Sequence, residues 1–182
     1  MIRAFAALAL PEAVRFDLML VQQGLPVPRT VPVENLHLTL VFLGTLPERQ
    51  VEDIDLAFRQ VRAPGFELAL SGLGLFGGAK PRVVYAGAME SAGLRHLQAK
   101  VETAARGAGF DEPARRFVPH VTLARVQERG AEARRLEEAV ARRGGYVSAR
   151  FGVEDFRLYR SYLAAGGSVY EELACYPLGG ER

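Results

Sequence analysis

The sequence predicts an α+β fold with a largely antiparallel sheet. Helical and strand-like segments follow one another without the regular βαβ alternation that builds a parallel sheet. A short motif, His-x-Thr-Leu, occurs at residues 37–40 and again at residues 120–123. Each half of the chain also offers two helices, which favours an internal duplication. We therefore expect one domain over residues 1–182.

The first half of the chain predicts two strands and two helices. Residues 2–10 form an almost continuous apolar run, which is typical of a buried strand. Pro11 suits the first turn of the helix that follows, because its missing N–H is not needed there. Residues 36–43 predict a second strand that ends at Gly44. Residues 47–62 predict a second helix, with acidic residues early and arginines late, as the helix dipole favours.

The second half begins with two strands, at residues 66–75 and 82–88, joined by a glycine-rich turn. This turn contains a literal Gly-x-Gly-x-x-Gly, but a dinucleotide fingerprint needs a helix next, and here a strand follows. The remaining predicted elements are a helix over residues 94–108, a strand over 120–126, a helix over 132–142 and short strands at 150–153, 156–159 and 169–175.

The composition is that of a globular protein and argues against a protein that coats nucleic acid. Hydrophobic residues make up 49% and charged residues 24% of the chain, and the formal net charge is +2. Binding along a nucleic acid requires a far larger positive charge. A local excess lies between residues 115 and 160, where there are eleven arginines and six acidic residues. Most of these arginines fit solvated helix faces, but gripping one terminal phosphate needs only one or two of them.

Cys175 is the only cysteine, so a disulfide framework or a thiolate metal cluster within the chain is excluded. We expect it to be a small buried residue of a strand. Asp111 and Glu112 lie near the second motif, but their spacing matches no recognisable metal site. No apolar run approaches the roughly 20 residues that span a bilayer, and the apolar start is too short for a signal peptide. We expect a cytoplasmic protein without a metal, another cofactor or a membrane partner.

The repeated motif supplies the candidate catalytic side chains. Side chains alternate across a strand, so His37 and Thr39 point to one face while the neighbouring leucines point to the other. The same holds for His120 and Thr122. If the two halves pack about a pseudo-twofold axis, these four polar side chains meet across a shared cleft.

Two imidazoles and two hydroxyls suit the opening of a 2′,3′-cyclic phosphate. Histidine titrates near pH ~6.5, so one neutral and one protonated ring coexist near neutrality. The pair can act as general base and general acid on opposite sides of a phosphorus atom. The hydroxyls can donate hydrogen bonds to the non-bridging oxygens, and no metal is required.

At this point the sequence resembles the two-histidine (2H) phosphoesterases, and within them the RNA 2′,3′-cyclic phosphodiesterases, also called 2′-5′ RNA ligases. Two segments resemble the motif regions of this family: ENLHLTLVFLG at residues 34–44 and RRFVPHVTLAR at residues 115–125. GLGLFGGAKPRVVYAG at residues 72–87 resembles the middle hairpin of the family. The opening RAFAALALP resembles the first strand of the family, and the ending FRLYRSYLAAGGSVYEELACYPL resembles its last two strands.

The resemblance implies a bilobal fold, with two pseudo-twofold-related lobes of antiparallel sheet, helices on the outside and a central cleft. It also implies roles for individual residues. His37 and His120 would be catalytic, and Thr39 and Thr122 would bind the phosphate. A 2′-phosphate product implies that His37 is the proton donor to the leaving 3′ oxygen and His120 the proton acceptor that activates water. Arg125 matches a phosphate-binding arginine of the family. The expected partners are RNA ends or nucleotides with a 2′,3′-cyclic phosphate, and we expect a monomer.

Two residue-level questions remain open. Arg125 follows Thr122 by three positions, so strict alternation places it on the opposite face unless a bulge or the strand end redirects it. The chain has no Trp, so stacking of a base would fall to an aromatic such as Phe5, Phe42 or Phe117, each of which fits the core equally well.

Three other functions compete with hydrolysis of an RNA end. The chain could be a non-catalytic module that binds RNA ends or nucleotides, although two intact His-Thr pairs favour an enzyme. It could be a 2H phosphodiesterase for another cyclic phosphate, such as a cyclic ADP-ribose phosphate. It could join RNA ends reversibly by a 2′-5′ linkage, with a ribose 5′-OH in place of water.

Overall fold

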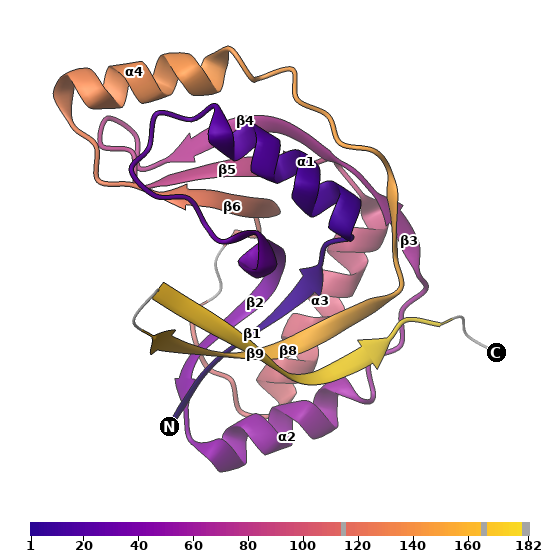
Figure 1. Ribbon diagram of the computed structural model, residues 1–182. Coiled ribbons are helices and arrows are strands. Elements are labelled where there is room, and N and C mark those ends of the chain that lie inside the picture. The colour runs from indigo at the N-terminus through magenta and orange to yellow at the C-terminus, as the bar shows by residue number, and fades with distance from the viewer. Residues whose placement is uncertain (114–115, 165–166, 180–182) are drawn as a thin grey trace.

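The computed structural model describes residues 1–113, 116–164 and 167–179. In these residues seven strands form one curved antiparallel sheet in the order β4-β5-β6-β2-β1-β8-β9, and β3 and β7 form a small second sheet (Figure 1). The elements are β1 (Ile2–Ala9), α1 (Glu12–Gln23), the 3-10 turn η1 (Val33–Asn35), β2 (His37–Leu46), α2 (Glu48–Phe58), β3 (Phe66–Leu68), β4 (Leu70–Phe76), β5 (Val83–Ala88), α3 (Ala92–Gly107), β6 (His120–Arg125), α4 (Gly130–Ala141), β7 (Phe151–Val153), β8 (Asp155–Ala164) and β9 (Gly167–Pro177).

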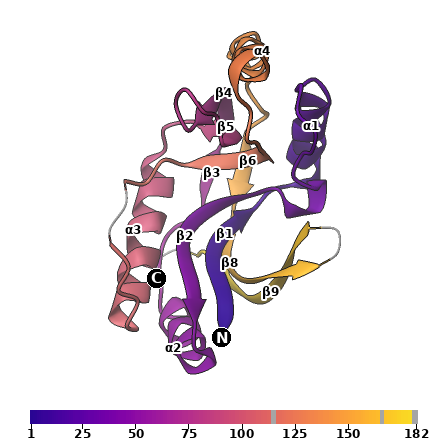
Figure 2. The ribbon, with the colours of Figure 1, turned by 90° about the vertical axis from the view of Figure 1, so that its left-hand side faces the viewer.

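The large sheet consists of two lobes that meet where β2 pairs with β6. This pairing contains a single residue pair, Leu38 with Val121, after which the two strands diverge (Figure 2). The strand order is symmetrical about this point, because β5 and β4 continue from β6 while β1 and β8 continue from β2. The predicted bilobal α+β fold is confirmed.

The first helix of each half packs on the lobe of the other half. Helix α1 follows β1 but contacts β6, and α3 follows β5 but contacts β2. Helices α1 and α4 lie beside the β4–β6 lobe, and α2 and α3 lie beside the lobe that contains β1 and β2 (Figure 1). Because each of α1 and α3 is connected to one lobe and packs on the other, these two helices hold the two lobes in a fixed relative position.

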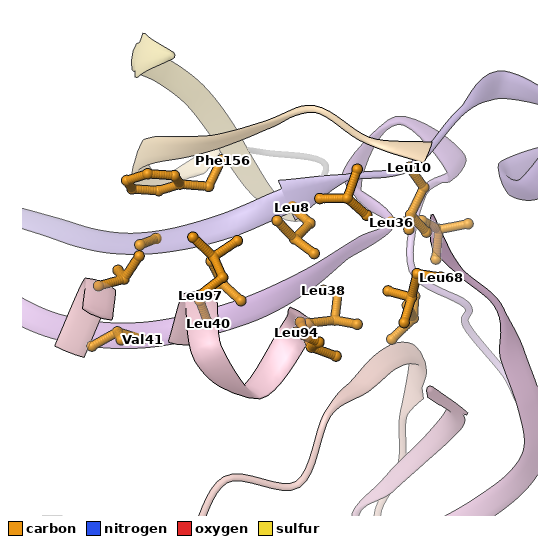
Figure 3. Packing of buried hydrophobic residues seen from close by; sticks show 14 of the residues in the cluster. Leu8, Leu10, Leu36, Leu38, Leu40, Val41, Leu68, Leu94, Leu97 and Phe156 are labelled. Atoms are coloured by element: carbon orange, nitrogen blue, oxygen red, sulfur yellow. The ribbon is translucent and has the colours of Figure 1, made fainter. Parts of the chain in front are cut away.

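A hydrophobic core behind β1 and β2 holds the functional face in place. Leu8, Leu38 and Phe156 from the strands and Leu94 and Leu97 from α3 are at most 1% exposed and lie together in this core (Figure 3). Burying such a side chain contributes about 1.5–3 kcal/mol. Because alternate residues of β2 enter the core, the residues between them are held on the opposite face.

Several predicted boundaries were wrong. Strand β2 continues to Leu46 instead of ending at Gly44, since this glycine adopts a positive φ of 73° at a bulge and the pairing with β1 resumes beyond it. The predicted strand over residues 66–75 is two strands in different sheets. The burial expected for Cys175 was also wrong. Its side chain is exposed, because the next residue along β9, Tyr176, points into the core.

The closing strands β8 and β9 are much longer than predicted and form a long hairpin. Among the described helices, none combines the length and the apolar character required to cross a membrane.

Candidate active site

The two His-x-Thr motifs lie side by side on one face of the sheet. The antiparallel pair of Leu38 with Val121 sets the register, so His37 lies across from Thr122 and Thr39 lies across from His120. Leu38 and Val121 are fully buried, whereas the four polar residues are partly exposed. The structure therefore brings together all four residues that the sequence analysis selected.

Both histidines have the same orientation and tautomer. The Nδ1–H group of His37 donates to the carbonyl of Asn35 at 2.7 Å, and that of His120 donates to the carbonyl of Val118 at 2.7 Å. A carbonyl only accepts, so Nδ1 carries a proton in each ring, and Nε2 is the nitrogen left for chemistry. Nε2 of His37 accepts a hydrogen bond from the Thr39 hydroxyl at 3.1 Å.

Aromatic side chains enclose both imidazoles. His37 lies 4.8 Å from Phe5 and 5.2 Å from Tyr170, measured between ring centroids. His120 lies 4.9 Å from Phe76 and 5.5 Å from Tyr85. Phe76 and Tyr85 stack on each other at 4.2 Å. The sequence analysis missed these contacts, apart from naming Phe5, because an aromatic residue in a strand is equally typical of a core.

Gly74 explains how Tyr85 reaches His120. A Cβ atom at this position would lie 2.4 Å from the hydroxyl and ring of Tyr85, far inside contact distance. The glycine therefore lets the tyrosine lie flat over β4. The glycine-rich sequence that the sequence analysis rejected as a dinucleotide fingerprint therefore has a structural role in the wall of this site.

The surroundings of His37 lower its pKa. Burial lowers the pKa of His37, and the positive charges of Arg125 and His120 lower it further, while the hydrogen bond to the Asn35 carbonyl opposes these effects. In the ligand-free protein, His37 is therefore more readily deprotonated than an ordinary histidine.

A β-bulge places Arg125 on the same face as Thr122. The pairing of β5 with β6 steps from Val84–Ala124 to Tyr85–Thr122, so Leu123 is an extra residue. Leu123 and Ala124 are both fully buried, and Arg125 is exposed. Of the two alternatives that the sequence analysis left open, a bulge or the strand end, the bulge is present, and it shifts the alternation by one residue.

A cavity of about 670 Å³ opens beside the motifs, and its wall includes Thr39 and His120. Phe42 and Phe117 also line it; Phe42 is 48% exposed and Phe117 is half-buried. Phe5 is 4% exposed and contacts His37, so its face is not available to a base. In residues 1–113, 116–164 and 167–179, no group of three or more His, Cys, Asp or Glu side chains could hold a metal ion.

The sequence of the chain is similar to those of known proteins. A model of the 2′-5′ RNA ligase superfamily matches residues 21–163. The chain is 38% identical to the RNA 2′,3′-cyclic phosphodiesterase of Thermus thermophilus, over 99% of this chain and 92% of that relative. It is 36% identical to the RNA 2′,3′-cyclic phosphodiesterase of Geobacillus stearothermophilus, over 86% of this chain, and it spans only 50% of that longer relative.

The fold is also similar to solved structures. Apo E. coli LigT matches with a TM-score of 0.80 and 28% sequence identity, over 98% of each chain. LigT has also been crystallised with 3′-AMP.

Proposed function

Because the chain belongs to the 2′-5′ RNA ligase superfamily, we propose that it is a hydrolase, an RNA 2′,3′-cyclic phosphodiesterase that opens a terminal cyclic phosphate to a 2′-phosphomonoester without a metal. The observation that carries this proposal is the antiparallel contact between the two motifs, which places two imidazoles and two hydroxyls on one face. This arrangement suits proton transfer on both sides of one phosphorus atom.

In the proposed reaction, Nε2 of His120 removes a proton from water as the oxygen attacks phosphorus. The bond from phosphorus to the 3′ oxygen breaks, and protonated His37 gives its Nε2 proton to that oxygen. The two histidines thereby exchange protonation states, and exchange with solvent resets them. Nε2 is the reacting nitrogen in both rings, since Nδ1 of each is already held by a carbonyl.

The lowered pKa of His37 leaves less of the ring protonated in the ligand-free protein, but two effects keep it suited to the role of general acid. An imidazolium with a low pKa is a stronger acid and transfers its proton more readily. The bound phosphate carries a negative charge, which favours the protonated ring when it is needed.

Thr39, Thr122 and Arg125 would bind the non-bridging phosphate oxygens. All three lie on the face that carries the histidines. Their hydroxyl and guanidinium donors would stabilise the negative charge that increases in the transition state.

Phe42 is the best placed of the three aromatic candidates for stacking the terminal base. It lies in the cavity wall with Thr39 and is 48% exposed, and the guanidinium of Arg3 covers its ring at 4.9 Å. Phe117 lies in the same wall but packs against the core. The expected partners are therefore RNA ends and nucleotides rather than long duplexes.

Reversible 2′-5′ ligation is a second activity of the same site, and the superfamily name of the matching model favours it. A ribose 5′-OH would replace water as the group that His120 deprotonates. We further propose that the enzyme acts as a monomer in the cytoplasm, in RNA processing. One chain supplies both motifs, and a free thiol such as that of Cys175 is compatible with a reducing compartment.

The test is an assay in EDTA with a short RNA that ends in a 2′,3′-cyclic phosphate, followed by identification of the product. We expect ring opening to a 2′-phosphate at an unchanged rate. A 3′-phosphate product would reverse the roles of the histidines. Loss of activity in EDTA, or binding without turnover, would refute the proposed reaction.

A further inference from the structure

Gln22 is a buried polar residue that the proposed reaction leaves unexplained. It lies in the last turn of α1, on the buried face that also carries Val14 and Leu18, and is 4% exposed. Its side-chain amide donates to the carbonyl of Leu123 at 2.9 Å and to the carbonyl of Val31 at 2.8 Å. Burying an amide is unfavourable unless it is hydrogen-bonded, so these two bonds satisfy both partners.

The carbonyl of Leu123 belongs to the extra residue of the β6 bulge. A bulged residue drops out of the regular ladder and leaves a backbone group without a strand partner. On the side of β6 that faces β2, the ladder contains only the pair of Leu38 with Val121. The Leu123 carbonyl instead accepts from Gln22 and from the backbone N–H of Val31 at 2.8 Å.

The bulge decides where Arg125 points. In a regular strand, Thr122 and Arg125 would lie on opposite faces, and the arginine would point into the core. With Leu123 and Ala124 both directed inward, Arg125 lies on the face of Thr122.

The other half of the site has an equivalent bulge but no equivalent amide. The pairing of β1 with β2 steps from Ala6–Val41 to Ala7–Thr39, so Leu40 is the extra residue there, and the exposed residue that follows is Phe42. Gln22 and Phe42 have counterparts 83 residues later in Ala105 and Arg125, the same spacing that separates the two histidines. The half that carries the arginine is thus contacted by an amide from α1, and the half that carries Phe42 is covered by α3 with a fully buried alanine.

We infer that Gln22 is a positioning residue for Arg125, because its amide holds the bulge that directs the guanidinium toward the phosphate. This inference rests on the proposed function, in which Arg125 binds the phosphate.

The test compares Gln22→Met, which keeps the length of the side chain but cannot donate, with Val14→Ala on the same buried face. The substrate is a nucleoside 2′,3′-cyclic monophosphate. Displacing an aligned group by about 1 Å can lower a rate about 10²-fold, and we expect Gln22→Met to lower kcat/KM about tenfold. In an Arg125→Ala background the same change should have less than about a twofold effect, because the group it positions is gone. Val14→Ala should leave kcat/KM within about twofold in both backgrounds.

A second measurement does not depend on phosphate binding. The positive charge of Arg125 lowers the pKa of His37, and His120 contributes in the same direction. An NMR titration of the His37 ring should therefore show a higher pKa in Gln22→Met and in Arg125→Ala, and an unchanged pKa in Val14→Ala. Gln22→Asn, which shortens the reach of the amide by one methylene, should shift the pKa in the same direction and serves if the Met variant does not fold.

The two possible failures give different results. If Arg125→Ala retains full kcat/KM while the His37 pKa still rises, the phosphate role of Arg125 is wrong and the positioning by Gln22 stands. If the Gln22 variants leave both kcat/KM and the His37 pKa at wild-type values, or act equally in the Arg125→Ala background, the inference is wrong.

Discussion

The two lobes present the same proton-transfer unit but different substrate contacts. In each lobe a histidine donates from Nδ1 to the carbonyl two residues earlier, and two aromatic rings enclose it. Five residues after the histidine, one lobe carries Phe42 and the other carries Arg125. The two lobes thus hold their histidines in the same way, whereas the residue five positions later is an apolar contact on one side and a charged contact on the other.

The lobes also differ in how closely they cover their histidine. The hairpin of β8 and β9 brings Tyr170 against His37, and Asn35 donates from its side chain to the carbonyl of Ser168 at 2.7 Å. This cover buries His37 and lowers its pKa.

The largest expected effect is the loss of either histidine. His37→Ala and His120→Ala should each lower kcat about 10²- to 10⁴-fold, the usual contribution of a positioned acid or base. His96→Ala is the control, because this third histidine is exposed on α3, and it should keep wild-type activity. A near-normal rate in either of the first two variants would show that the substituted histidine is neither the acid nor the base of the reaction.

A substrate in which sulfur replaces the bridging 3′ oxygen distinguishes the acid from the base. A thiolate leaves without protonation, since a thiol is far more acidic than an alcohol. This substrate should restore most of the rate of His37→Ala and none of the rate of His120→Ala. Rescue of His120→Ala alone would exchange the acid and base roles.

Phe42 and Arg125 should respond to different parts of the substrate. Arg125→Ala should lower kcat/KM about 10²-fold, as loss of one charged transition-state contact does. Phe42→Ala should raise KM about tenfold, because stacking contributes about 1–3 kcal/mol per base. With ribose 2′,3′-cyclic phosphate, which has no base, the Phe42 effect should vanish and the Arg125 effect should remain. Equal effects of Phe42→Ala on both substrates would contradict stacking.

Gly74→Ala should have a smaller effect, confined to the lobe of His120. The new methyl group displaces the Tyr85 ring, and overpacking of this kind costs about 1–3 kcal/mol of stability. We expect a lower melting temperature and a kcat reduced a few-fold. Gly152→Ala is the matched control, because a methyl group there meets open space in β7. Identical melting temperatures for the two variants would show that the Tyr85 contact is dispensable.

The smallest expected change is a shift in pH dependence. A general acid must be protonated, so kcat/KM should fall as the pH rises through the pKa of His37, which lies below its ordinary value of 6.5. Removing the positive charge in Arg125→Ala raises this pKa, so the alkaline fall should move to higher pH. If the alkaline fall of kcat/KM moved to lower pH in this variant, the group that titrates there would not be His37.

The sequence was sufficient for those parts of the site that are encoded locally. His37, Thr39, His120 and Thr122 repeat in two apolar strands, and strand alternation alone places each pair on one face. The sheet order was not visible, because pairing partners are chosen by contacts far apart in the chain. The apolar pattern made the closing strands β8 and β9 too short, although the resemblance implied two strands there.

The position of Arg125 shows where local reasoning ends. Alternation alone gives the wrong face, and the bulge that corrects it is supported by Gln22, about one hundred residues earlier in the chain. Likewise, Tyr85 enters the site because a glycine faces it on the neighbouring strand. These features depend on the packed partners of a strand, which its own sequence does not contain.

The exchange of helices between the lobes has an evolutionary consequence. Since α1 packs on β6 and α3 packs on β2, neither half of the chain covers its own sheet with its own first helix. A half-length ancestor would therefore have needed a second copy of itself, with the two copies trading helices in a domain-swapped homodimer. Fusion of two such genes would turn that symmetrical partnership into a covalent one, after which Phe42 and Arg125 were free to evolve separately.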